Sequence, residues 1–139
     1  MKLASRILIL FCALLTWGCS QEEPRNLPGP PPGFLQEKAN LLRGEGLFAA
    51  HCAECHGTLA EGRTQRAARF NPPAPDFRER HYRRVKPGYL YRRIEQGRLL
   101  EPFRSRGSVM PPWGPYLTKD EIWSLVAYLL SRSAEVEVK

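Results

Sequence analysis

The chain has 139 residues, of which 42% are hydrophobic and 10% aromatic, and it contains 4 Cys. This length fits one domain and is too short for a TIM barrel or a Rossmann enzyme with a second domain, and the apolar content excludes a wholly disordered chain. Four Cys are too few for a disulfide scaffold of this size, and the formal net charge of +7 favours an acidic partner or surface without identifying it.

The first 19 residues have the pattern of a secretory signal peptide. Lys2 and Arg6 precede an uncharged, mostly apolar run at residues 7–17. This run is shorter than the ~20 helical residues that a bilayer core requires, and it has the proportions of a signal-peptide apolar region. We therefore expect export of the protein and loss of Cys12 together with this segment.

Gly18 and Cys19 directly follow the apolar run and resemble the lipobox of bacterial lipoproteins. The resemblance implies that Cys19 carries a lipid and becomes the mature N-terminus. The pattern departs from the family at Thr16, where an aliphatic residue is usual, so cleavage without lipidation and an uncleaved anchor are the alternatives. Acyl chains hold a protein on a membrane because each buried CH₂ contributes about 0.8 kcal/mol. We expect a lipid-anchored protein on the periplasmic side of a bacterial membrane.

Residues 20–36 are predicted to form a Pro-rich tether. Five prolines and two glycines in this segment exclude a helix and favour an extended polyproline II chain. At ~3.1 Å per residue the segment would reach about 50 Å. Residues 37–133 are then expected to form the globular domain, with a short C-terminal tail at residues 134–139.

Cys52, Cys55 and His56 form a Cys-x-x-Cys-His motif, which is typical of covalent haem c attachment. Two thiols on one helical turn can reach the two vinyl groups of a porphyrin, and His56 then ligates the iron and donates its other ring N–H to a backbone carbonyl. A redox disulfide lacks the expected βαβ context. A zinc site that includes His51 would need four ligands within six residues, which cannot easily surround one ion.

Residues 40–132 resemble a class I cytochrome c. Gly44 and Phe48 lie eight and four residues before Cys52, where that family has a small residue and an aromatic residue. This spacing places both on one face of a helix that leads into the motif. The resemblance implies an all-α fold of about three to four helices around one covalently bound haem c. It also implies that Tyr128 of the last helix packs against Gly44 and Phe48.

Met110 is the only methionine outside the signal segment, and Pro111, Pro112 and Trp113 follow it. This order is similar to the distal loop of the cytochrome family. Two prolines stiffen a loop, so it can present a soft thioether sulfur to iron at little entropic cost. We expect Met110 to be the distal iron ligand, with His81 as its main rival. An open distal site would instead make the protein a five-coordinate haem sensor or ligand-binding protein.

A proline-rich loop follows the haem motif. In similar cytochromes, the carbonyl of a proline in this loop accepts the N–H of the proximal histidine. Pro72, Pro73 and Pro75 all qualify here, and the sequence does not decide among them.

Two further helices are predicted, and no segment is predicted to be a strand. Residues 86–96 have Pro87 at a first helical position and Gly97 at the C-terminal stop. The last helix starts with a capping box formed by Thr118 and Glu121, and its apolar residues repeat at helical spacing through residue 130.

The positive charge is concentrated in the middle of the chain. Loss of Lys2 and Arg6 leaves 19 basic and 14 acidic residues, and residues 62–106 alone hold 13 basic and 4 acidic side chains. Such a segment can pair with haem propionates or steer an acidic redox partner, and export disfavours nucleic acid. We expect a non-enzymatic, membrane-tethered electron carrier or respiratory-complex subunit that exchanges single electrons with acidic redox partners. A zinc-binding interaction module is the weaker alternative to a haem protein.

Overall fold

The computed structural model describes residues 27–58 and 61–135, with side chains through residue 132. Several predictions lie outside the described residues, namely the signal peptide at 1–19, Cys19, residues 20–26 of the tether and residues 136–139 of the tail. Within the described part the chain forms five α-helices, three 3₁₀ helices and no strand, which confirms the predicted all-α fold.

Three α-helices have ten or more residues: α2 (Lys38–His51), α5 (Pro87–Gln96) and α6 (Lys119–Glu135). Two helices of four residues each, α3 (Ala53–His56) and α4 (Gln65–Ala68), account for the difference from the three to four helices expected. The 3₁₀ helices are η2 (Phe34–Gln36), η3 (Arg80–Arg84) and η4 (Gly97–Leu99).

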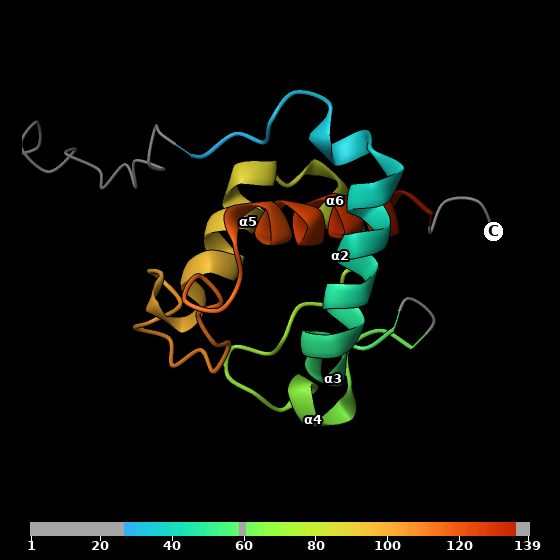
Figure 1. Ribbon diagram of the computed structural model, residues 1–139. Coiled ribbons are helices and arrows are strands. Elements are labelled where there is room, and N and C mark those ends of the chain that lie inside the picture. The colour runs from blue at the N-terminus through green and yellow to red at the C-terminus, as the bar shows by residue number, and fades with distance from the viewer. Residues whose placement is uncertain (1–26, 59–60, 136–139) are drawn as a thin grey trace, which may run out of the picture.

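Helices α2 and α6 cross and form the framework of the domain (Figure 1). At the crossing, a Cβ added to Gly44 would overlap the carbonyl oxygen of Ser124 and lie 2.9 Å from the Tyr128 Cβ. The rings of Phe48 and Tyr128 pack with 5.4 Å between centroids. The predicted contact of Tyr128 with Gly44 and Phe48 is confirmed. The absence of a side chain at Gly44 is what lets the two backbones approach this closely.

The ends of α5 and α6 follow the predicted signals. The Thr118 N–H donates to the Glu121 carboxylate at 2.8 Å, and the Glu121 N–H donates to Thr118 Oγ1 at 3.3 Å, which completes the capping box. Helix α5 begins at Pro87 and ends at Gln96, and the next residue is Gly97, whose φ of 51° lies in the region that favours glycine.

Residues 27–36 belong to the predicted tether, but in the structure they lie against the domain (Figure 1). Helix η2 packs against α2 and α6, and the Asn40 side chain donates to the Phe34 carbonyl at 3.1 Å. A Cβ on Gly88 of α5 would overlap the Pro28 carbonyl oxygen. This end of the segment therefore differs from the extended, free chain that its composition indicates.

The buried core lies along α6, against which α2 and α5 pack separately, and its members include Phe48, Leu90, Ile94, Leu125 and Leu129. The described parts of the long connections, residues 57–58, 61–86 and 97–118, extend from this core without regular secondary structure for most of their length. No helix in the described ranges combines the length and the apolar composition needed to cross a bilayer.

Candidate functional site

A cavity of about 570 Å³ lies between the end of α2, α3, α5 and the two long connections. Its volume falls within the ~300–1,000 Å³ that is typical of ligand and cofactor sites. Aromatic, aliphatic and proline side chains form most of its wall. The residues of the wall that can bind or ligate a cofactor include Cys52, Cys55, His56 and Met110.

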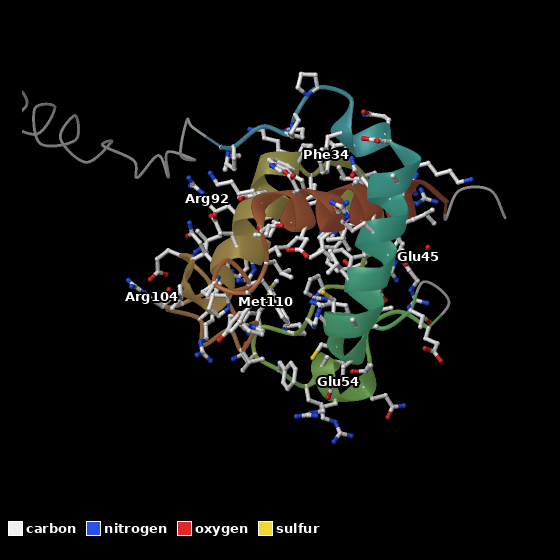
Figure 2. All side chains as sticks on the ribbon, in the orientation of Figure 1. Phe34, Glu45, Glu54, Arg92, Arg104 and Met110 are labelled. Atoms are coloured by element: carbon white, nitrogen blue, oxygen red, sulfur yellow. The ribbon has the colours of Figure 1, made fainter. Side chains whose placement is uncertain are left out.

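The two thiols come to the cavity through the turn that joins α2 to α3. The Cys52 N–H donates to the Phe48 carbonyl at 2.9 Å, and the His56 N–H donates to the Cys52 carbonyl at 3.0 Å. Both Cys52 and Cys55 are half-buried and have free thiols. Glu54, between them in sequence, is largely exposed and lies at the edge of the molecule (Figure 2). Cys52 and Cys55 both line the cavity.

Burial and charge set the protonation of the first thiol. Burial raises the pKa of the Cys52 thiol to about 12, and the neighbouring Cys55 adds to the effect, while Arg132 opposes it. The thiol is therefore protonated at neutral pH.

The described residues offer no set of ligands for zinc, the weaker alternative. Among them, no group of three or more His, Cys, Asp or Glu side chains could hold a metal ion.

The His56 imidazole is held by a backbone carbonyl. Its Nδ1 lies 3.0 Å from the Pro75 carbonyl oxygen. Of the three prolines that the sequence left open, Pro75 is therefore the one whose carbonyl meets His56. A carbonyl only accepts, so Nδ1 carries the proton and Nε2 is available as a ligand. Burial lowers the pKa of His56 more than this hydrogen bond raises it, which favours the neutral imidazole. The ring centroids of Phe77 and Phe48 lie 5.0 and 6.4 Å from the centroid of the imidazole ring.

Asp76 fixes the loop that supplies this carbonyl, and the sequence analysis missed it. Its carboxylate accepts the Arg78 backbone N–H at 3.0 Å and the Arg78 guanidinium at 2.7 Å. The Arg78 side chain holds the pKa of the Asp76 carboxyl at about 2. An aspartate whose side chain bonds the backbone two residues on is a recognised turn signal, so Asp76 and Arg78 could have been identified from sequence.

Met110 lies on the connection between η4 and α6, near the centre of the molecule (Figure 2). The Met110 carbonyl accepts the Arg98 N–H at 2.7 Å, and the Trp113 N–H donates to the Ile94 carbonyl at 3.1 Å. A Cβ on Gly97 would overlap the Pro111 carbonyl oxygen. These contacts fasten the Met110 segment to the end of α5. Met110 and His56 line the same cavity.

Arg93 is a second residue that the sequence analysis missed. Its guanidinium donates to Ser108 Oγ at 2.8 Å and to the Gly97 carbonyl, and it stacks over the Phe103 ring at 3.8 Å. Ser108 Oγ in turn accepts the Met110 N–H at 3.4 Å. Burial lowers the pKa of Arg93, but a guanidinium stays charged in proteins. Arg93 thus braces the Met110 segment from α5.

The other two histidines differ in their relation to the cavity. His81, the rival ligand, is exposed, lies 3.4 Å from the Glu79 carboxylate and stacks on Tyr82, and it does not line the cavity. His51 lines the cavity edge with its ring 5.3 Å from that of Trp113.

The donor set fits a covalently attached haem. It offers two free thiols, an imidazole with Nε2 available and a thioether, all around one largely apolar cavity. Fold and site together define the class of protein: a small all-α c-type cytochrome domain with one covalently bound haem c. The comparison with known families then gives its particular branch. Residues 39–129 match the family described as "Cytochrome C oxidase, cbb3-type, subunit III", and the chain belongs to this family.

Three curated relatives show similarity over most of this domain. Cytochrome c-L of Methylorubrum extorquens is 27% identical over 96 residues, which cover 69% of this chain and 42% of the relative. The cbb3-type cytochrome c oxidase subunit FixP of Sinorhizobium medicae is 31% identical over 99 residues, which cover 70% of this chain and 31% of the relative. FixP of Azorhizobium caulinodans is 26% identical over 106 residues, which cover 76% of this chain and 30% of the relative. The chain thus spans less than half of each relative.

Proposed function

We propose that this chain is an exported, membrane-tethered monohaem cytochrome that passes single electrons between respiratory redox partners. The observation that carries the proposal is the shared cavity of His56 and Met110, with Nε2 of His56 left available by the bond to Pro75. When bound, haem c supplies a one-electron iron couple. Cys52 and Cys55 would attach the ring, and His56 and Met110 would ligate the iron. A methionine ligand in place of a second histidine would raise the reduction potential of the iron.

The surroundings of these residues suit electron transfer without substrate turnover. The wall of the cavity is largely apolar, with Phe77, Leu90 and Trp113 among its residues, so it offers few polar groups to hold water beside the cofactor. Hydrogen bonds hold the Met110 segment to α5 at Ile94 and Arg93, and to η4 at Arg98. A braced ligand loop in a largely apolar site moves little when the charge of the centre changes, so electron transfer requires little rearrangement of the protein.

We propose an acidic docking surface on the redox partners. Exposed cations in the basic segment of residues 62–106 would steer such a partner and raise its association rate at low ionic strength. The names of two relatives as oxidase subunits support a respiratory setting, either as a free carrier or as a subunit of a complex. The exposed cations are Arg66, Arg69, Arg80, Arg84, Lys86, Arg98, Arg104 and Arg106.

We also propose that the protein is exported and anchored to a membrane by a lipid at its N-terminus. Residues 1–19 would direct export, Cys19 would carry the lipid, and residues 37–133 would form the haem domain on the periplasmic side of the membrane. The intact mass of the mature protein tests this directly, because it reports the cleavage site, the acyl chains on Cys19 and one attached haem together. A mature chain that begins elsewhere, or that carries no acyl mass, would contradict the anchor.

Optical spectroscopy of the haem-loaded protein tests the ligand set. We expect a six-coordinate spectrum with a methionine–iron charge-transfer band and no ready binding of CO. Met110→Ala should lose the band and bind CO, whereas His81→Ala should keep the native spectrum. An unshifted six-coordinate spectrum in Met110→Ala would refute the axial assignment. Ready CO binding by the native protein would instead support the haem sensor, and a colourless protein from a host that attaches haem would support a zinc module.

A further inference from the structure

Arg132 of α6 is a buried arginine whose charge the site described above does not use. Its exposed fraction is 1%. Nη2 donates to the Gly57 carbonyl at 3.5 Å, and Nε and Nη1 have no hydrogen-bond partner among the described residues. A guanidinium is not deprotonated in proteins, so the positive charge persists in this enclosed position.

The guanidinium lies beside the haem motif. Its central carbon is 4.4 Å from the centroid of the Phe48 ring, and that ring is 6.4 Å from the His56 imidazole. Gly57, which accepts the Nη2 bond, directly follows His56 in the chain. The Arg132 guanidinium therefore lies near His56, on the side of the site that this histidine occupies.

No carboxylate of the described residues forms an ion pair with Arg132. Burial lowers the pKa of Arg132, and Tyr128 and then Asp76 oppose this, but the Asp76 carboxylate is already paired with Arg78 at 2.7 Å. The Arg78 charge works against that of Asp76 at Arg132. The arginine is thus a cation that is both buried and poorly compensated, which is costly for the fold.

A fixed cation in a medium of low dielectric constant disfavours the gain of a second positive charge nearby. Oxidation of a haem iron adds one positive charge, and reduction removes it. We propose that Arg132 tunes the cytochrome by raising the reduction potential of its haem. This inference rests on the proposed electron-transfer function. Phe48 transmits no charge; it holds the guanidinium in place by a cation–π contact.

Redox titration of haem-loaded variants tests the inference. Arg132→Met and Arg132→Gln remove the charge, Arg132→Lys retains it, and Arg66→Gln removes a charge from a side chain that is 78% exposed. We expect both neutral variants to shift the one-electron equilibrium at least threefold, and up to tenfold or about 59 mV, toward the oxidised form. Arg132→Lys and Arg66→Gln should remain within twofold of the wild type.

Ionic strength and stability separate charge from packing. The shift in the neutral variants should persist from ~0.01 to ~1 M salt, because a buried charge is screened little. Free energies of unfolding measured in urea report any packing defect separately. An unchanged potential in Arg132→Met and Arg132→Gln, or an equal shift in Arg132→Lys, would overturn the role of the charge. A wild-type protein without a reversible one-electron couple would overturn the proposed electron-transfer function, and this inference with it.

Discussion

Replacement of Gly44 by alanine probes the crossing of α2 and α6, which positions the haem motif at the end of α2. The added Cβ would overlap the Ser124 carbonyl oxygen and stand 2.9 Å from the Tyr128 Cβ. The first obstacle is backbone, so no side-chain rotation relieves it, and the helices must separate. Overpacking of this kind costs up to about 3 kcal/mol, and the helix propensity of alanine returns about 1 kcal/mol. We expect Gly44→Ala to destabilise the protein by about 2 kcal/mol.

Urea unfolding of the haem-loaded protein, followed by tryptophan fluorescence, measures this change. With a slope of ~1–3 kcal/mol per molar urea, the midpoint should fall by about 1 M. Gly46→Ala is the matched control, because Gly46 is exposed on the same helix and its added Cβ would meet nothing within 4 Å. This variant should gain about 0.5–1 kcal/mol. If Gly44→Ala is as stable as Gly46→Ala, the close approach of the helices does not limit stability and the reasoning fails.

Three further changes test the caps and loops. Thr118→Ala should lower the free energy of unfolding by about 1 kcal/mol, measured in urea, through loss of the α6 cap. Asp76→Asn should cost about 1–2 kcal/mol at neutral pH, because Arg78 holds the Asp76 pKa at about 2, below its unfolded value near 3.9. The cost should vanish in urea midpoints as the pH falls from about 4 to 2, where the wild type loses the same stabilisation; a gap that persists would contradict this. Ser108→Ala should loosen the Met110 segment and tighten imidazole binding about fivefold in a spectral titration, a difference of about 1 kcal/mol.

Features that depend on neighbouring residues were readable from the sequence. The capping box at Thr118, the start of α5 at Pro87 and the glycine that ends it are all local devices, since each requires only a few adjacent residues. The haem motif is local in the same way, because covalent attachment demands two thiols and a histidine at a set spacing. The contact of Gly44 with Tyr128 is long-range, and it was predicted only through the resemblance to a family.

Tertiary structure decided the features in which distant segments meet. It selected Pro75 from three prolines by bringing its carbonyl to His56, and it laid residues 27–36 against the domain although their composition favours an extended chain. It also buried Arg132, a residue type that sequence alone places at the surface, beside Gly57, which is 75 residues earlier in the chain. Local pattern encodes propensity and spacing, whereas burial and its electrostatic consequences depend on which surfaces the fold brings together.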